Sequence, residues 1–232
     1  MNVLITGASR GIGRELLKRY SKEHTVYTVA RNVNELKNLK NVVPIEMDLA
    51  DVKRVNEYFK KLDVSFDLVI ANAAISLPHS PNFTPFCDFK KTIDINFLSV
   101  HAMLEGVVPR MRGGKIVFIS SLASLVGAPG SMPYSASKRA LNSYAQSLRN
   151  LLAPKIKVIN IMPGFIKTDM TSKNNFYMPF LMELEEGVDE IVYAIEKGKK
   201  EYAFPKRFYY LIKLFNILPV FIQDAILQRV GK

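Results

Sequence analysis

The length and composition of this chain exclude several classes of protein. With 232 residues, 48% of them hydrophobic and 10% aromatic, the chain can bury a sizeable core and does not resemble a disordered segment. No run reaches the roughly 18–20 apolar residues of a membrane-spanning helix, and a strand expected from residue 2 leaves no room for a secretory leader. The only cysteine, Cys87, excludes an internal disulfide and fits a reducing compartment, so we expect a cytoplasmic protein.

The net charge of +11 at pH 7 could indicate a nucleic-acid or anionic membrane partner. The basic residues are scattered, however, and the only tight cluster consists of Lys197, Lys199 and Lys200. Because no motif of a nucleic-acid-binding module is present, we expect a solvated basic surface and no nucleic-acid partner. We also expect no metal site.

Apolar runs alternate with helical patterns along the whole chain. Strands are expected at Val3–Thr6, Thr25–Ala30, Val42–Glu46, Leu68–Ala71, Lys115–Ser120, Ile156–Ile161 and Glu201–Phe204. Helices are expected near Gly13–Ser21, Val52–Leu62, Asp88–Arg110, Tyr134–Leu152 and Val188–Lys197. Strands that alternate with helices of this length indicate βαβ units. The predicted fold class is α/β, a single doubly wound Rossmann-type domain over residues 1–232. We expect a mostly parallel sheet of about seven strands with helices on both faces.

The first strand runs directly into a glycine-containing turn that ends in a helical pattern. Gly7, Gly11 and Gly13 allow the backbone to turn tightly and to approach an anion, while the N-terminus of the helix favours negative charge. The G-x-x-x-G-x-G spacing departs from the G-x-G-x-x-G fingerprint, and no Gly-Lys-Ser/Thr follows that would indicate a P-loop. We therefore predict a nucleotide site, with a tight turn that holds no ligand as the alternative.

The residues after the second strand indicate whether the ribose of that nucleotide carries a free 2′-hydroxyl or a 2′-phosphate. An NAD site usually carries Asp or Glu there, whereas a 2′-phosphate requires positive charge. This chain has Ala30-Arg31-Asn32, and Arg10 lies inside the glycine turn. Two guanidinium groups could bind one phosphate, so NADP(H) is predicted in preference to NAD(H). Two solvated surface arginines are the alternative.

A tyrosine and a lysine lie four residues apart at Tyr134 and Lys138, which places them on one helix face. Spacing alone does not select this pair, because Tyr-x-x-x-Lys also occurs at Tyr193/Lys197, Tyr202/Lys206 and Tyr209/Lys213. Only Tyr134 follows a strand that ends in Ser120-Ser121, at the edge where a parallel sheet places its ligand. A loop with glycine and proline at 127–133 could return the helix to that edge.

Taken together, these motifs resemble those of the compact branch of the short-chain dehydrogenases/reductases. The matching residues cover positions 2 to about 170 and are Thr6-Gly7-x-x-x-Gly11-x-Gly13, Asp48-Leu49, Asn72-Ala73-Ala74, Asn96, Ser121, Tyr134, Lys138, Pro163-Gly164 and Thr168. One position departs slightly, because the family more often has glycine where this chain has Ala74.

The resemblance implies a role for each of four residues. Tyr134 would be the general acid/base, and Lys138 would lower the pKa of its phenol and bind the nicotinamide ribose. Ser121 would hydrogen-bond the substrate carbonyl oxygen, although a shift of one residue to Ser120 remains open. Asn96 would hold a water that connects Lys138 to solvent, or alternatively would satisfy a helix irregularity.

The resemblance also implies a set of cofactor-binding residues. Asp48 would accept from the adenine amino group with Leu49 beside the ring, and Asn72 would steady the loop over the ribose. Ile166 and Thr168 would contact the carboxamide. The full predicted set is Gly7, Ser9, Arg10, Gly11, Ile12, Gly13, Arg31, Asp48, Leu49, Asn72, Ala73, Tyr134, Lys138, Pro163, Gly164, Ile166 and Thr168.

Two segments near the C-terminus bear on substrate and partners. Residues 168–184 are expected to form a substrate lid, whose aromatic and aliphatic side chains suit an apolar or lipid-like substrate. Residues 206–230 are expected to form an amphipathic extension with basic residues. This extension could pack on the body, form a subunit interface of a homodimer or homotetramer, or lie on an anionic membrane.

We therefore predict an NADP(H)-dependent oxidoreductase that transfers hydride between the cofactor and a small-molecule carbonyl or alcohol. A non-catalytic NADP(H)-sensing protein of the same fold is the alternative, although such a protein has no need of Asn96, Ser121, Tyr134 and Lys138 together. A sugar-nucleotide epimerase or dehydratase fits poorly, because those relatives usually have a longer C-terminal domain.

Overall fold

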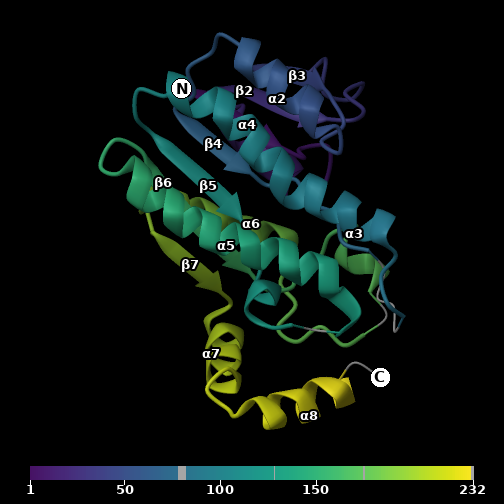
Figure 1. Ribbon diagram of the computed structural model, residues 1–232. Helices are drawn as coiled ribbons and strands as arrows, with labels where there is room; N and C mark the ends of the chain where they lie inside the picture. Colours follow the sequence, from purple (N-terminus) through teal and green to yellow (C-terminus); the bar gives the residue numbers. More distant parts are fainter. Residues whose placement is uncertain (78–81, 128, 175, 231–232) are drawn as a thin grey trace.

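The computed structural model describes residues 1–77, 82–127, 129–174 and 176–230, and residue 230 is described by its backbone alone. A seven-stranded sheet in the order β3-β2-β1-β4-β5-β6-β7 forms its centre (Figure 1). Every strand pair is parallel, which confirms the predicted sheet and makes it wholly rather than mostly parallel. The strands are β1 (Asn2–Thr6), β2 (Thr25–Ala30), β3 (Val42–Glu46), β4 (Leu68–Ala71), β5 (Lys115–Ile119), β6 (Lys157–Pro163) and β7 (Glu201–Phe204).

Helices cover both faces of this sheet, because alternate residues of each buried strand point to opposite sides. In β1, Leu4 belongs to the same core cluster as Phe59, whereas Ile5 belongs to the cluster on the other face with Leu17. The first face is covered by α2 (Val52–Lys61), α4 (Ser99–Val107) and α5 (Met132–Leu152), and the second by α1 (Gly11–Tyr20) and α6 (Leu184–Glu196).

The helix predicted for residues 88–110 is interrupted in the structure. It consists of α3 (Phe86–Ile93), a π-helical turn (Asp94–Leu98), α4 and a short 3₁₀ turn (Val108–Arg110). The wide turn contains Asn96, whose side chain bonds outside the helix, as described below. Such turns are rare and often lie at functional sites.

The order of the strands places the ligand site. From β1 the chain winds outward through β2 to β3, then crosses to β4 on the other side of β1 and continues to β7. A crevice opens beyond the carboxyl ends of the strands where this direction reverses, between β1 and β4. The predicted glycine turn and the residues after β4 therefore meet at one edge.

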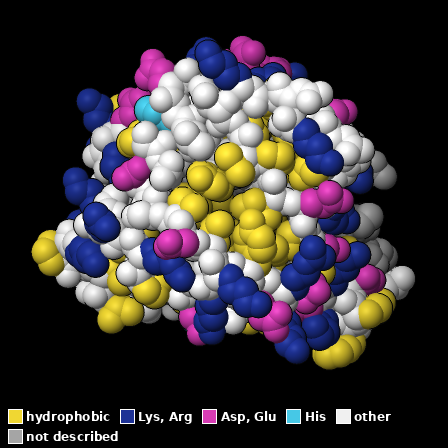
Figure 2. Space-filling model, turned by 90° about the horizontal axis from the view of Figure 1, so that it is seen from above, with side chains coloured by type: hydrophobic (Ala, Val, Ile, Leu, Met, Phe, Trp, Pro, Cys, Tyr) yellow, Lys and Arg dark blue, Asp and Glu magenta, His cyan; other side chains and the backbone are white. Residues whose placement is uncertain are grey.

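After β7 the chain forms α7 (Lys206–Phe215) and α8 (Val220–Val230), which extend from the body (Figure 1). Ile212 of α7 is buried in a small cluster with Leu122 and Met162. No helix in the described part of the chain is long and apolar enough to span a membrane. On the face in Figure 2, lysine and arginine side chains are spread around the rim with acidic side chains among them, as the sequence predicted.

Candidate active site

The turn after β1 brings three segments into contact. Gly7 has a positive φ of 72°, and a Cβ there would lie 2.8 Å from the Cα atom of Ala73. A Cβ on Gly13 would lie only 2.3 Å from the Gly7 carbonyl oxygen, so neither position has room for a side chain. The Thr6 hydroxyl accepts hydrogen bonds from the backbone N–H groups of Asn72 (3.1 Å) and Ala73 (3.0 Å). These contacts tie the glycine turn to the end of β4.

A cavity of about 570 Å³ opens at this edge of the sheet, and every residue predicted to hold the cofactor lines it. Its wall includes glycines at a helix N-terminus, which suit a pyrophosphate. Arg31 and Asp48, the residues predicted to contact the ribose side and the adenine, line the same cavity. The residues present therefore fit a nicotinamide dinucleotide. Ser121, Tyr134 and Lys138 line the same cavity, so the structure brings the two predicted halves of the site together.

Tyr134 is half-buried on the first turn of α5, and its hydroxyl lies near the side chain of Ser121. Burial raises the pKa of the Tyr134 phenol, and the Ser121 side chain opposes that rise in part. Ser121 in turn accepts a hydrogen bond from the backbone N–H of Ala123 at 3.1 Å, which fixes its hydroxyl at the start of a 3₁₀ turn. A phenol and a second hydroxyl thus lie near each other at the wall of the cavity.

Lys138 lies one turn further along α5 and is buried. Its Nζ donates to the carbonyl oxygen of Ile119 at 2.7 Å and lies 5.8 Å from the centroid of the Tyr134 ring. Burial lowers the pKa of Lys138 from 10.5 to about 7. The expected lowering of the phenol's pKa is not observed here, because desolvation acts on both groups and the lysine loses part of its charge near neutral pH.

Asn96 lies behind the cavity wall, fully buried in the π-helical turn. Its Oδ1 accepts from the backbone N–H of Ile75 at 2.8 Å, and its Nδ2 donates to the Ile75 carbonyl (2.9 Å) and to Ser137 Oγ (3.0 Å). The side-chain amide therefore holds the segment after β4, which lines the cavity, against α5. Both N–H groups of the Asn96 side chain therefore have partners in the protein, and neither is left to donate to a water relay.

The two serines that the sequence left open have different partners. Ser120 Oγ donates to Asn142 Oδ1 at 2.6 Å and is buried. Ser121 is the one whose side chain lies near the Tyr134 hydroxyl at the cavity wall. This arrangement agrees with the spacing that favoured Ser121, because the Ser120 hydroxyl is bonded to Asn142 of α5 instead.

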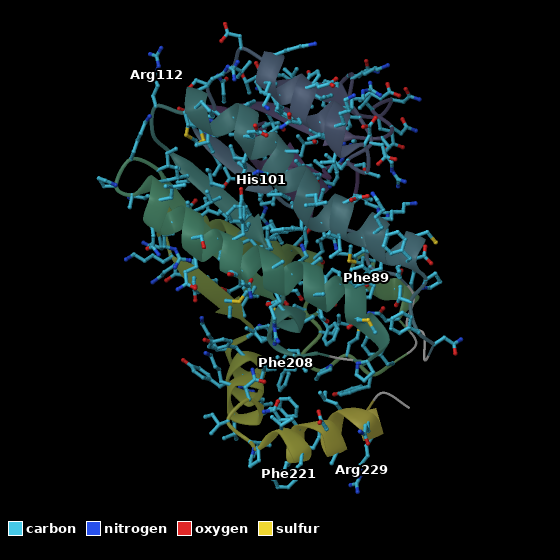
Figure 3. The ribbon with its side chains drawn as sticks, in the orientation of Figure 1. Phe89, His101, Arg112, Phe208, Phe221 and Arg229 are labelled. Atoms are coloured by element: carbon cyan, nitrogen blue, oxygen red, sulfur yellow. The ribbon has the colours of Figure 1, made fainter. Side chains whose placement is uncertain are left out.

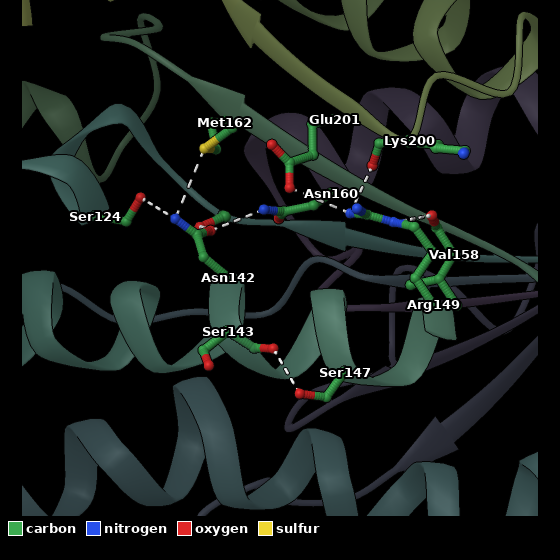
Figure 4. Close-up of polar contacts among 11 residues, drawn as sticks. Ser124, Asn142, Ser143, Ser147, Arg149, Val158, Asn160, Met162, Lys200 and Glu201 are labelled. Carbon is green, nitrogen blue, oxygen red and sulfur yellow. Dashed lines mark hydrogen bonds and ion pairs between the residues drawn. The ribbon is translucent and has the colours of Figure 1, made fainter. Parts of the chain in front are cut away.

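Asn142 was missed by the sequence reading. Its Oδ1 also accepts from Asn160 Nδ2 of β6 at 2.9 Å, and its Nδ2 donates to Ser124 Oγ at 2.6 Å (Figure 4). Ser124 Oγ in turn donates to the backbone carbonyl of Ser121. Asn142 thus connects β6, α5 and the Ser121 segment. Its position four residues after Lys138, on the same helix face, was the only signal that the sequence offered.

Arg10 and Arg31, the two predicted phosphate ligands, lie exposed at the rim of the cavity. Arg10 Nε is 3.8 Å from Asp169 Oδ2, a second residue that the sequence reading missed. Asp169 directly follows Thr168, so the ion pair connects the glycine turn to the start of the predicted lid. Both side chains are exposed, and such pairs contribute little to stability.

The segment predicted as a lid begins beside the cavity. Its described part contains a 3₁₀ turn (Thr171–Lys173) and a parallel bridge between Ile166 and Met182, while Asn175 lies outside the described residues. The ring of Phe165 packs against Phe176, with centroids 5.9 Å apart, and stacks on Phe208 of α7 at 5.9 Å. Phe208 also contacts Phe180 at 5.8 Å. These rings form an aromatic cluster next to the Pro163-Gly164 wall.

Comparisons with known proteins agree with this geometry. A family model of short chain dehydrogenases matches residues 1–177. An uncharacterized oxidoreductase from Myxococcus xanthus is 33% identical, over 97% of this chain and 96% of its own. A short chain dehydrogenase from Burkholderia cenocepacia in complex with NADP is 25% identical, with a TM-score of 0.80 over 99% of this chain and 96% of that chain. A 4-hydroxyisoleucine dehydrogenase in complex with NADH and succinate is 26% identical, with a TM-score of 0.76 over 87% of this chain and 96% of that chain.

The fold, the dinucleotide cavity and these relatives agree on an NAD(P)-dependent oxidoreductase that acts on CH–OH or C=O groups. The family model covers more than half of the chain, including the glycine turn and the Tyr134/Lys138 pair. This chain belongs to the short-chain dehydrogenase/reductase family.

Proposed function

We propose that this protein reduces an apolar carbonyl compound with NADPH, and that Tyr134 is its general acid. The observation that carries the proposal is that Ser121, Tyr134 and Lys138 line the same cavity as the glycine turn. A phenol whose pKa is raised by burial stays protonated at neutral pH, which suits a proton donor.

Each residue of the site has its own role in the reduction of the carbonyl group. The nicotinamide cofactor, when bound, supplies the hydride. Ser121 donates a hydrogen bond to the substrate carbonyl oxygen, where negative charge develops. Tyr134 gives its Oη proton to that oxygen. Lys138 lies against the tyrosine ring, and its remaining N–H donors can bind the cofactor ribose. Asn96 and Asn142 are positioning residues, because they act through Ile75 and Ser121.

The preference for NADP(H) over NAD(H) is supported by Arg10 and Arg31 at the rim, since neither position carries an acid that would bind a ribose 2′-hydroxyl. Fluorescence titration with NADPH and NADH tests it. Arg31→Ala should weaken NADPH binding by about tenfold while NADH affinity changes little. Equal or tighter binding of NADH to the unaltered protein would contradict the assignment.

An apolar substrate is supported by the ring cluster of Phe165, Phe176, Phe180 and Phe208 beside the cavity wall. We propose that residues 168–184 close over such a substrate as a lid. A panel of long-chain, cyclic and small polar ketones and aldehydes, followed by NADPH absorbance, should show kcat/KM rising with apolar surface.

Tyr134→Phe is the decisive variant for the acid/base role. It should reduce turnover by about a thousandfold and leave NADPH affinity nearly unchanged, because only the proton donor is lost. Activity that survives this change would refute the assignment. A protein that binds NADPH tightly but reduces none of the panel would favour the alternative, a non-catalytic NADP(H)-sensing role.

We further propose a cytoplasmic homodimer or homotetramer. The exposed Cys87 is compatible with a reducing compartment, and Leu151, Phe86 and Leu98 are exposed apolar side chains outside the C-terminal extension that an interface between copies would cover. Light scattering coupled to size-exclusion chromatography measures the mass, and a monomer at micromolar concentration would refute the proposal.

A further inference from the structure

The C-terminal helices have one anchored side and one side without a partner. On the anchored side of α7, Ile212 is buried, and Phe208 points toward the body (Figure 3). Asn216 Nδ2 donates to the carbonyl oxygen of Leu125 at 3.0 Å. In Figure 3, Phe221 and Arg229 lie on the opposite side, beyond α8. The extension is thus held in place by one face only.

Large apolar side chains crowd the unanchored side. Each is between 54% and 78% exposed, and together we call them the C-terminal apolar surface: Tyr210, Leu211, Leu214, Ile217, Val220 and Phe221. The first three lie at helical spacing on α7, Ile217 lies in the short connection, and Val220 and Phe221 begin α8. An apolar patch of this extent on a folded protein marks an interaction site.

The charges around this surface favour an anionic lipid surface over a second copy of the chain as its partner. Four basic side chains, Lys206, Arg207, Lys213 and Arg229, are exposed within α7 and α8, against one exposed acid, Asp224. Arg207 lies one turn before Tyr210 and Leu211 on the same face of α7. A twofold interface between copies would bring two such patches together, each with an excess of positive charge, because both copies use the same surface. An anionic lipid surface would instead accept apolar and basic groups together.

We propose that the C-terminal apolar surface docks this protein onto anionic membranes as a peripheral contact, with α7 and α8 lying along the lipid–water boundary. Phe221, Leu214 and Ile217 would enter the acyl boundary, while Arg207 and Lys213 would contact lipid phosphates. This proposal does not depend on the reaction that the protein catalyses, since it rests on residues outside the cavity.

The docking also has a geometric consequence. Phe208, on the anchored side of α7, stacks on Phe165 next to the Pro163-Gly164 wall of the cavity. The helix that would touch the lipid therefore also packs beside the cavity. A docked molecule would hold that side of its cavity near the membrane.

Co-sedimentation of the whole protein with phosphatidylcholine vesicles, with and without phosphatidylserine, tests the proposal. We expect binding that rises with the phosphatidylserine content and falls with salt. Leu214→Ser combined with Phe221→Ser should reduce the bound fraction by about tenfold. Arg207→Gln combined with Lys213→Gln should reduce binding to the anionic vesicles only.

Phe83→Ser is the matched control, because Phe83 is 84% exposed and lies outside the C-terminal apolar surface. It should bind vesicles like the unaltered protein. Failure of the unaltered protein to bind anionic vesicles would overturn the proposal, as would an equal loss in the control. If the double serine variant instead changes the mass in solution and leaves lipid binding unchanged, the surface is an interface between copies. Unchanged cofactor binding shows that each variant is folded.

Discussion

The Nζ atom of Lys138 donates a hydrogen bond to the carbonyl oxygen of Ile119 at 2.7 Å, on a side chain that is 2% exposed. Among the described residues, Lys138 forms no ion pair with a carboxylate. A buried ammonium without a counter-charge is costly, which is why the pKa of Lys138 falls to about 7. Groups perturbed in this way often lie at catalytic sites.

Lys138→Met should therefore make the protein more stable at neutral and acidic pH. The pKa of Lys138 in the folded protein lies below its value of 10.5 in a free side chain. The destabilisation is thus complete below pH 7 and disappears as pH rises toward 10.5. Full removal of the charge penalty would add about 5 kcal/mol to the free energy of unfolding, less whatever the bond to Ile119 contributes.

Urea denaturation of both proteins between about pH 6 and pH 9.5 measures this difference, within the range that the linkage argument covers. The gap between the curves should narrow as pH rises, while turnover of the variant should be lost. If the two proteins have equal free energies of unfolding, or if their difference grows with pH, the assignment of a buried, partly neutral lysine is contradicted.

Asn142→Leu should destabilise the protein and also impair turnover. The change removes the partner of Ser120 Oγ and of Asn160 Nδ2, and leaves Ser124 without the amide that fixes it. Buried groups left without partners cost about 1–3 kcal/mol each, so a loss of roughly 3 kcal/mol is expected. Because Ser124 holds the Ser121 carbonyl, kcat should fall more than NADPH affinity.

Ser147→Ala serves as the control on the same helix, since its hydroxyl makes one exposed bond of 3.2 Å to the Ser143 carbonyl (Figure 4). It should change neither stability nor kcat measurably. If Asn142→Leu lowers stability but kcat per folded molecule is intact, Asn142 holds β6 and α5 together without positioning Ser121.

Much of the fold and of the site location could be predicted, because the signals are local. The glycine turn can be predicted from residue type alone, since few residues other than glycine tolerate the positive φ of Gly7. Tyr134 and Lys138 share a helix face by spacing, and Ser121 follows a buried strand at the ligand edge. Each inference uses periodicity or the rule that parallel strands place ligands at their carboxyl ends.

The remaining features depend on contacts between distant segments. Asn142 acquires its role only because α5 packs on β6, which the sequence does not show. The pairing of Arg10 with Asp169 depends on how the loop after β6 returns to the glycine turn. The pKa of Tyr134 is raised rather than lowered because burial, a property of the whole fold, outweighs the opposing effect of the Ser121 side chain.

Asp169→Asn should tighten NADPH binding by about threefold and leave NADH affinity unchanged. Asp169 competes for Arg10 at 3.8 Å, and its negative charge would repel a 2′-phosphate bound there. The effect should shrink as salt is raised, because both side chains are exposed. Asp63→Asn, which removes an equally exposed carboxylate away from the cavity, should change neither affinity. An equal gain for NADH would mean that Asp169 faces the part common to both cofactors.

Gly13→Ala should abolish cofactor binding, although alanine normally favours a helix over glycine. A Cβ at this position would lie 2.3 Å from the Gly7 carbonyl and 2.6 Å from Asn72 Nδ2, and the backbone of the glycine turn cannot move without releasing β4. Overpacking of this kind should cost about 3 kcal/mol of stability, with a loss of NADPH affinity that titration measures.

Gly127→Ala provides the contrast, because a Cβ there meets nothing within 4 Å. It should bind NADPH normally and unfold within about 1 kcal/mol of the unaltered protein. Normal NADPH binding by Gly13→Ala would show that the turn can open, and that the phosphate site is not built on the close approach of these two glycines.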